Sequence, residues 1–94
     1  MDTTAIRHEG DRHRFMVNEQ GSEAFVEYAR DGDVLVITHT VVPPEIGGRG
    51  IAGKLVEAAL QYARGEGLKV RPDCSYAEAY MRRHPEHADL LAAA

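Results

Sequence analysis

The chain has 94 residues, and 11 Lys and Arg against 15 Asp and Glu give it a net charge of −4. This length fits one small domain, residues 1–94, and a hydrophobic content of 44% is enough for a packed core, which excludes a disordered chain. The acidic balance argues against a nucleic-acid-binding protein, whose affinity rests on clustered Lys and Arg.

Membrane and disulfide signals are also missing from the sequence. No apolar run approaches the roughly 18 residues of a membrane span, and the first residues form no targeting signal. The one cysteine, Cys74, cannot make an internal disulfide, which favours a reducing compartment. We therefore expect a cytoplasmic domain without membrane or nucleic-acid partners.

Three strands are predicted in the first half of the chain, after an irregular start that joins the sheet edge. Residues 14–17 form the first, residues 18–22 are turn formers, and residues 24–29 alternate at the strand period of two. Asp31-Gly32 favours a tight hairpin, so the strand of residues 34–42 returns antiparallel to the second.

The third of these strands is expected to be central in the sheet. Its first half, residues 34–37, is apolar on both faces, which fits a strand that is covered on both sides. Regular alternation then places Ile37, His39 and Val41 on one face. His39 is therefore expected to point where Ile37 points.

The second half of the chain begins with a loop and a helix. Pro43-Pro44 ends the third strand, and residues 45–50 form a glycine-rich loop that leads into an amphipathic helix over residues 51–66. A short strand follows over residues 68–71. A strand, loop, helix and strand in this order favour a parallel crossover.

A second helix is expected from Ser75 to Arg83, because Ser75 and Glu78 have the spacing of a capping box. Pro85 ends or kinks it, and a helical turn over residues 88–91 follows. The fold class is therefore α+β, with an antiparallel meander, a strand-loop-helix-strand crossover and a C-terminal helix.

The glycine loop satisfies two nucleotide-binding patterns incompletely. Gly48, Gly50 and Gly53 spell G-x-G-x-x-G, but a proline-rich segment separates them from a strand that is not part of a doubly wound sheet. The same loop through Lys54 spells a P-loop, but Leu55 replaces the hydroxyl that would hold magnesium.

Both patterns share the physics of an anion site. Glycines let a backbone approach an anion, and the first turn of a helix presents unpaired amides with a partial positive charge. A pyrophosphate fits such a site, and the alternative is that residues 47–53 are only a mobile connector. The order of strand end, glycine loop and amphipathic helix favours the anion site.

Residues 41–56 resemble the acetyl-coenzyme A (acetyl-CoA) binding segment of the GCN5-related N-acetyltransferase (GNAT) superfamily. Over about residues 35–91 the chain is similar to the small, single-domain branch of that superfamily. The further features that carry this resemblance are His39-Thr40, Lys69-Val70-x-Pro72, Cys74 and His84-Pro85-Glu86.

The resemblance implies a GNAT-like acyl-CoA N-acyltransferase fold with a splayed pair of central strands and acetyl-CoA as cofactor. Backbone groups of the strand end would meet the pantetheine arm, and the loop amides would hold the pyrophosphate. The implied cofactor-binding residues are Val41, Val42, Gly48, Arg49, Gly50, Ile51, Ala52 and Gly53.

The chain departs from the superfamily pattern at two places. Gly47 stands where the loop usually has Gln or Arg, and Arg49 is close enough in sequence to replace that contact. Only residues 18–22 stand where larger members carry helices that build the acceptor pocket.

Three side chains are candidates for the chemistry of acetyl transfer. His39 titrates near neutrality and is a candidate base, or a histidine satisfied by a neighbouring hydroxyl. Cys74 lies near the positive end of the last helix, which lowers a thiol pKa, and is a nucleophile, a group that assists the departing thiolate, or a packed thiol. Tyr80 matches a superfamily tyrosine that protonates the leaving thiolate, but its spacing from Tyr76 also fits packing.

No metal site is predicted. His84 and His87 together with Cys74 offer ligand types, but Pro85 breaks the helix that would align the two histidines.

The predicted function is acetyl-CoA-dependent N-acetylation of a primary amine by direct transfer in a ternary complex, with Cys74 as a participant. The short front end predicts an open acceptor site, which suits an exposed amine of a protein or a polyamine, on a monomer or weak homodimer. One alternative is a non-catalytic acetyl-CoA-binding or protein-interaction module. Another is a protein that binds nucleotide phosphates.

Overall fold

The computed structural model describes residues 5–92. Its strands and helices are β1 (Arg7–Glu9), β2 (Arg14–Glu19), β3 (Ser22–Asp31), β4 (Val34–Val41), α1 (Ile51–Glu66), β5 (Lys69–Pro72) and α2 (Ser75–Arg83). Short 3-10 helices lie at Gly10–Arg12, Pro44–Ile46 and Pro85–Leu90. None of the helices in residues 5–92 is long and apolar enough to cross a membrane.

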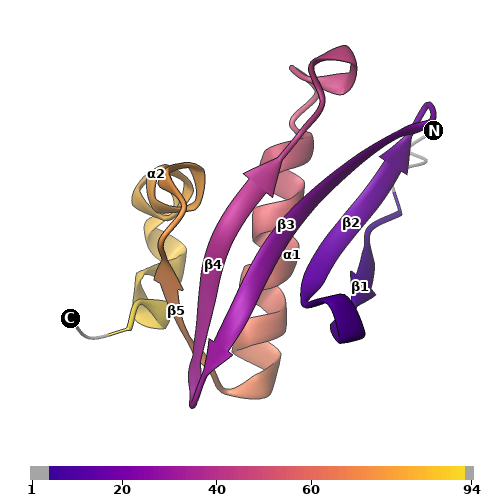
Figure 1. Ribbon diagram of the computed structural model, residues 1–94. Helices are drawn as coiled ribbons and strands as arrows, with labels where there is room; N and C mark the ends of the chain where they lie inside the picture. Colours follow the sequence, from indigo (N-terminus) through magenta and orange to yellow (C-terminus); the bar gives the residue numbers. More distant parts are fainter. Residues whose placement is uncertain (1–4, 93–94) are drawn as a thin grey trace.

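The five strands form one sheet in the order β1-β2-β3-β4-β5, in which β4 and β5 are parallel and the other neighbours are antiparallel. Figure 1 shows α1 along one face of the sheet and α2 beside the β5 edge, while no helix of residues 5–92 covers the opposite face. The α+β class, the meander and the parallel crossover are confirmed. The middle strand is β3 rather than β4, because β1 adds a strand at the other edge.

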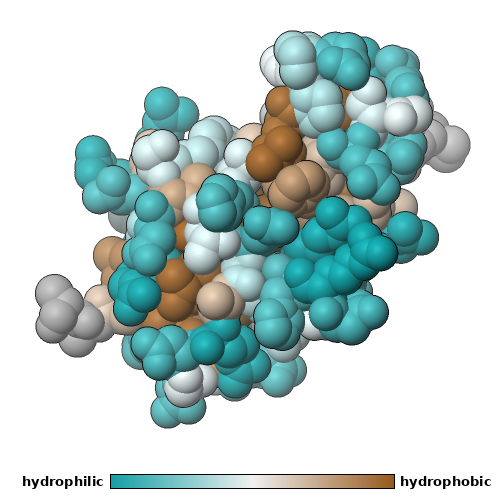
Figure 2. Space-filling view, in the orientation of Figure 1, coloured by the Kyte–Doolittle hydropathy of each residue, from teal (hydrophilic) through white to brown (hydrophobic). Residues whose placement is uncertain are grey.

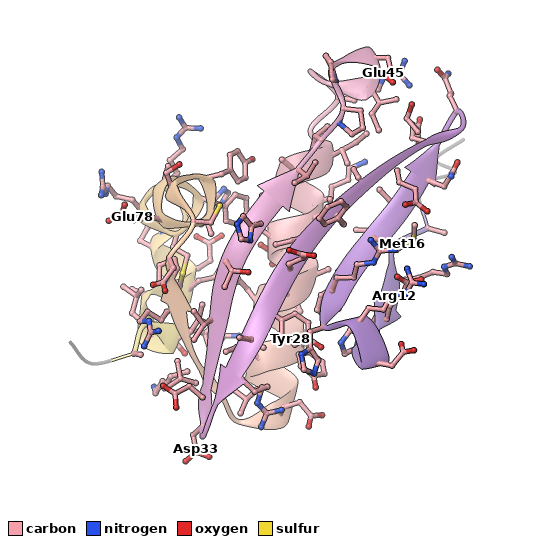
Figure 3. All side chains as sticks on the ribbon, viewed as in Figure 1. Arg12, Met16, Tyr28, Asp33, Glu45 and Glu78 are labelled. Carbon is pink, nitrogen blue, oxygen red and sulfur yellow. The ribbon has the colours of Figure 1, made fainter. Side chains whose placement is uncertain are left out.

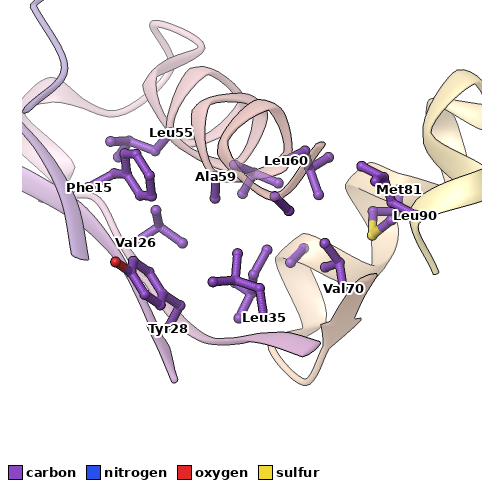
Figure 4. Close-up of a cluster of buried hydrophobic side chains, with 14 of the residues drawn as sticks. Phe15, Val26, Tyr28, Leu35, Leu55, Ala59, Leu60, Val70, Met81 and Leu90 are labelled. Atoms are coloured by element: carbon purple, nitrogen blue, oxygen red, sulfur yellow. The ribbon is translucent and has the colours of Figure 1, made fainter. Parts of the chain in front are cut away.

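The core lies between the sheet and α1 and reaches α2 at one end (Figure 4). Four residues of the predicted apolar stripe of α1, Leu55, Val56, Ala59 and Ala63, are at 0% exposure; Ala52 at the start of the stripe is only half-buried, and Leu60 is buried in addition. At the entrance to α1, Ile46 and Ile51 are also buried and anchor the glycine loop on both sides.

Element boundaries follow the predictions closely in the second half of the chain. The α1 helix spans the predicted residues, β5 lies one residue later than predicted, and Pro85 starts a separate 3-10 helix instead of continuing α2. The hairpin at Asp31-Gly32 also forms, with Gly32 at φ 59° as such a turn requires.

The prediction that His39 shares the face of Ile37 is wrong. Ile37 pairs with Tyr28 and His39 pairs with Glu27, so Thr38 is an extra residue that forms a β-bulge. A single extra residue moves the following side chains to the other face. Ile37 is therefore buried beneath α1, whereas His39 is exposed on the uncovered face.

The predicted capping box at the start of α2 is also wrong. The N-cap is Cys74, which has extended backbone angles, and Ser75 is already the first helical residue. No side-chain hydrogen bond caps this helix in the described structure, and Glu78 forms an ion pair with Arg82 one turn later, at 3.3 Å. The shift by one residue places a thiol where the prediction placed a hydroxyl.

Candidate functional site

An opening in the sheet lies where β5 ends and β4 continues. The β5 strand pairs with β4 only from Val34 to Ile37, and the amides of Asp73 and Cys74 then both donate to the carbonyl oxygen of Ile37, at 3.0 Å. Beyond Ile37, β4 has β3 on one side and no strand of residues 5–92 on the other. The start of α2 faces β4 across this opening, which forms where β5 ends, after all four residues of β5 have paired with β4.

The glycine loop leaves the first turn of α1 bare. Gly48 and Gly50 have φ of 77° and 75°, and an added Cβ at either residue would meet no atom within 4 Å. The amides of Ile51, Ala52 and Gly53 lie in the first turn and have no acceptor within the helix. The N-cap residue, Gly50, has no side chain that could accept from them instead. These amides and the helix dipole together favour an anion at this place.

A cavity of about 400 Å³ adjoins this turn between α1 and α2. Its lining includes Gly50, Gly53, Lys54 and Glu57 of the α1 region and Tyr80 and His84 of the α2 region. Gly53 is needed for the close packing of α2, because a Cβ there would lie 3.3 Å from the Tyr76 hydroxyl and 3.4 Å from the Tyr80 ring. Unpaired amides and a lysine beside one cavity are a donor set that fits a phosphate group.

Arg49 points to the β2–β3 hairpin. Its guanidinium lies 3.2 Å from a carboxylate oxygen of Glu19 and 3.3 Å from the amide oxygen of Gln20. A second tie joins the same parts, because the Ser22 hydroxyl donates to Glu45, which stands at the tip of the β4–α1 connection in Figure 3. The hairpin therefore holds the glycine loop in place, and Lys54 is the basic side chain that lines the cavity.

Cys74 faces β4 across the opening. Its Sγ lies 3.3 Å from the Thr40 hydroxyl, and its position as N-cap directs it toward the amides of the first turn of α2. Burial raises the pKa of this thiol, but the Thr40 hydroxyl and the amides of Ala77, Tyr76 and Thr40 outweigh burial, so the pKa lies below its usual range. The predicted setting of Cys74 at the positive end of a helix is confirmed.

His39 lies on the other face of β4 from the Thr40 side chain. Its side chain is 69% exposed, and Nδ1 is 3.5 Å from a carboxylate oxygen of Glu27 on the neighbouring strand. The structure thus brings Thr40 and Cys74 together and separates His39 from both by the thickness of the sheet.

Sequence reasoning missed a polar network around Glu57. The Tyr80 hydroxyl donates to Glu57 at 2.6 Å, and Nε2 of His87 lies 3.0 and 3.1 Å from the two carboxylate oxygens. Arg64 approaches Nδ1 of His87 at 3.3 Å and pairs with Asp89. Because Arg64 can only donate, Nδ1 accepts and Nε2–H donates to Glu57.

This network fixes the protonation of its members. Burial raises the pKa of Glu57, but hydrogen bonds from Tyr80, Gln61 and His87 outweigh burial and lower it. Burial and the Glu57 carboxylate raise the pKa of Tyr80 well above its usual range. The one signal for this network in the sequence is Glu57 on the polar stripe of α1, and its partners are 23 and 30 residues away.

Comparison with known proteins identifies the family of this chain. Residues 14–90 match the family model of the GCN5-related N-acetyl-transferase. The chain belongs to the GCN5-related N-acetyltransferase family. The matched segment includes the meander, the glycine loop, both helices and the residues at the opening of the sheet.

Relatives of this GNAT family member are found in vertebrates and bacteria. Protein NATD1 of mouse and of human is 35% identical over 83 residues, which cover 85% of this chain and 76% and 74% of those proteins. NATD1 of zebrafish is 31% identical over 92% of this chain and 83% of its own length. The solution structure of a GCN5-like protein from Staphylococcus aureus superposes with a TM-score of 0.78 at 26% identity, over the whole of this chain and 93% of that one.

Of the predicted cofactor-binding residues, Gly50 and Gly53 line the cavity together with Tyr80, while Cys74 lies at the opening of the sheet. In residues 5–92, no three His, Cys, Asp or Glu side chains converge to hold a metal ion. His84 pairs with Glu86 and His87 with Glu57, so the two histidines serve different contacts.

Replacing Tyr80 by phenylalanine tests what its hydroxyl does. The hydroxyl donates a hydrogen bond to the Glu57 carboxylate, so its loss is expected to lower the free energy of unfolding by about 1 kcal/mol. We expect turnover with amines to change by less than about threefold, because the hydroxyl proton of Tyr80 is engaged in the hydrogen bond to Glu57 and is not directed at a leaving group. Urea unfolding and steady-state kinetics measure the two effects, with Tyr76→Phe on the same helix as control. A loss of turnover on the order of 100-fold at unchanged stability would instead assign Tyr80 as the proton donor.

Proposed function

We propose that this protein is an acetyl-CoA-dependent N-acetyltransferase that moves an acetyl group to a primary amine by direct transfer in a ternary complex. One observation carries the proposal. The bare first turn of α1 packs against α2, since a Cβ on Gly53 would lie 3.3 Å from the Tyr76 hydroxyl, and Cys74 is the N-cap of the same α2 helix, beside β4. An anion site on one side and a polarised thiol on the other suit a ligand with a pyrophosphate at one end and a thioester at the other.

The binding roles follow from which backbone groups lack partners. The amides of Gly48 to Gly53 would hold the pyrophosphate with Lys54 beside them, and the backbone of Val41 and Val42 would hold the pantetheine arm at the open edge of β4. Bound acetyl-CoA supplies an activated thioester.

The chemical roles concern protons. A lysine-like amine has a pKa of about 10.4, so it reaches the site as a cation and must lose a proton before it can attack. His39 is the group proposed to take that proton, and its exposure leaves it open to an incoming amine. Cys74, held by Thr40 and the start of α2, either assists the departing thiolate or carries the acetyl group briefly.

Thermal unfolding with added ligands is the first test of the proposed function. A ligand at about 100 times its dissociation constant adds roughly 2.7 kcal/mol of stability, which raises the Tm of a domain of this size by about 10 °C or more. We expect this shift with acetyl-CoA and with coenzyme A, but not with ATP or NAD. Stabilisation by ATP or NAD and not by coenzyme A would contradict the proposal and identify a nucleotide-binding protein.

A second candidate function is a non-catalytic acetyl-CoA-binding or protein-interaction module. The observation that favours it is the uncovered face of the sheet, since the described helices enclose only the opposite face. Turnover separates the candidates. An enzyme consumes acetyl-CoA faster than background hydrolysis when amines are supplied, and a binding module does not.

A further inference from the structure

The two edges of the sheet differ in how they are covered. At the β5 edge the chain covers itself, because Leu91 forms a bridge with Val70 and the Ala92 amide donates to the Val70 carbonyl oxygen at 2.9 Å. At the other edge β1 pairs with β2 alone, and no strand of residues 5–92 lies beyond it (Figure 1). An open edge strand presents unpaired backbone groups that can pair with a strand of another chain.

The β1 strand is short, but side chains at both of its ends hold it on the sheet. The His8 ring stacks on Phe15, with ring centroids 4.1 Å apart, and meets Tyr62 of α1 edge-on at 4.5 Å. Glu9 pairs with Arg14 of β2 at 2.6 Å. Because these contacts fix β1 in an extended conformation, a partner strand would pair with it at a low cost in conformational entropy.

The charges of β1 match a second copy of the same strand. Arg7 and Glu9 flank His8, and the alternation of a strand places these two side chains on one face. Antiparallel strands that pair about His8 would therefore place Arg7 of each copy opposite Glu9 of the other. Opposite charges at such positions stabilise an antiparallel pair, whereas like charges would oppose it. The Arg7 side chain is 70% exposed and can reach a partner strand.

The surroundings of β1 determine how strong such a contact can be. Figure 2 shows mainly hydrophilic side chains over the β1–β2 side of the molecule. A contact at this edge would consist of backbone hydrogen bonds and ion pairs, with little apolar surface buried. Contacts of this kind are small and weak.

We propose that the β1 edge is a self-association surface, at which two copies of this chain pair their β1 strands antiparallel about His8. The contact is two-fold symmetric, because the same residues of both copies meet. It joins the two sheets into one and gives a weak dimer. The opening beside Cys74 lies at the β4–β5 side of the sheet and stays accessible in this arrangement. The inference does not depend on the proposed function.

Sedimentation equilibrium over a range of protein concentrations tests whether the dimer forms. An interface of this small size predicts a dissociation constant on the order of 100 µM, so dimer should be the main species at about 1 mM. A chain that is still monomeric at about 1 mM would contradict the proposal.

Charge substitutions on β1 test the register. Arg7→Glu places carboxylates opposite each other and Glu9→Lys places cations opposite each other, so each variant alone should dimerise about tenfold more weakly than the wild type. An equimolar mixture of the two variants should recover the wild-type affinity within about threefold, because each acidic position then meets a basic one. The matched control is Arg12→Glu, in the 3-10 helix that follows β1, for which we expect a change below about twofold.

A disulfide at the two-fold axis tests the same register without relying on charge. Directly opposed residues of antiparallel strands have Cα atoms about 4.5–5.5 Å apart, which a disulfide can span. His8→Cys is therefore expected to give a covalent dimer with oxidised glutathione. Arg12→Cys and the wild type, whose one cysteine is Cys74, should give none. Circular dichroism checks that each variant is folded.

The outcomes separate the β1 edge from other surfaces. If the wild type dimerises but the mixture recovers no affinity and His8→Cys forms no covalent dimer, the dimer uses another surface and the proposal fails. If Glu9→Lys unfolds because Arg14 loses its partner, Arg7→Glu and the disulfide still decide the question. Binding of an extended peptide to β1 of a chain that stays monomeric would overturn the proposal and assign the edge to a different partner.

Discussion

Replacing Cys74 by serine is expected to lower kcat for acetyl transfer by about 100-fold and to change the affinity for acetyl-CoA little. A serine hydroxyl fits the same N-cap position but stays protonated near neutral pH, whereas the Cys74 thiol is biased toward the thiolate. A group that moves a proton or carries the acetyl group contributes an effect of this size. Steady-state kinetics and calorimetric titration with coenzyme A separate the two parameters.

The Thr40 hydroxyl offers a second measurement of the same site. Because it lowers the pKa of the Cys74 thiol, Thr40→Val is expected to raise that pKa while keeping the shape of the side chain. The rate of alkylation by iodoacetamide follows the thiolate, so its pH profile should lie below that of an ordinary cysteine in the wild type and move to higher pH in Thr40→Val.

Two results would contradict the role given to Cys74. Unchanged kcat in Cys74→Ser would leave the thiol a packing role, with the acetyltransferase proposal intact. An alkylation profile at the pH of an ordinary thiol would remove the physical basis for its participation. Serine is the informative replacement, since alanine would also remove the side chain that stands at the N-cap of α2.

Local patterns were sufficient to predict α1, the Asp31-Gly32 hairpin and the bare glycine turn. The α1 helix has a long, strongly periodic apolar stripe, and Gly48 and Gly50 take positive φ angles in a loop that glycine makes accessible. Each of these features depends on residues that are close in the sequence, which is why it could be read directly.

The features that failed or were missed depend on contacts between distant residues. The bulge at Thr38 is set by the register of β4 against β3, and the local period of two contains no sign of it. The link from Thr40 to Cys74 spans 34 residues, and the link from Glu57 to His87 spans 30. The local pattern therefore places His39 on the wrong face and gives no sign of the contacts that Glu57 makes.

Gly50→Asp is expected to weaken coenzyme A binding by about 100-fold relative to Gly50→Asn. Asn and Asp are the residues other than glycine that best tolerate the left-handed backbone found at this position, where φ is 75°. An added Cβ meets no atom within 4 Å, so we expect both variants to fold. The two differ in one charge, and a carboxylate at the N-cap would repel the pyrophosphate and occupy the same amides.

Calorimetric titration with coenzyme A at two salt concentrations measures this difference. The repulsion should shrink as salt rises, because the turn is exposed to solvent and its charges are screened. Gly67→Ala is the control for backbone strain, since Gly67 has φ of 71° and lies at the opposite end of α1, away from the cavity. It should lose stability and keep its affinity. Equal affinities of the Asp and Asn variants would show that the first turn of α1 does not hold the pyrophosphate, and the cofactor would then have to be sought elsewhere on the molecule.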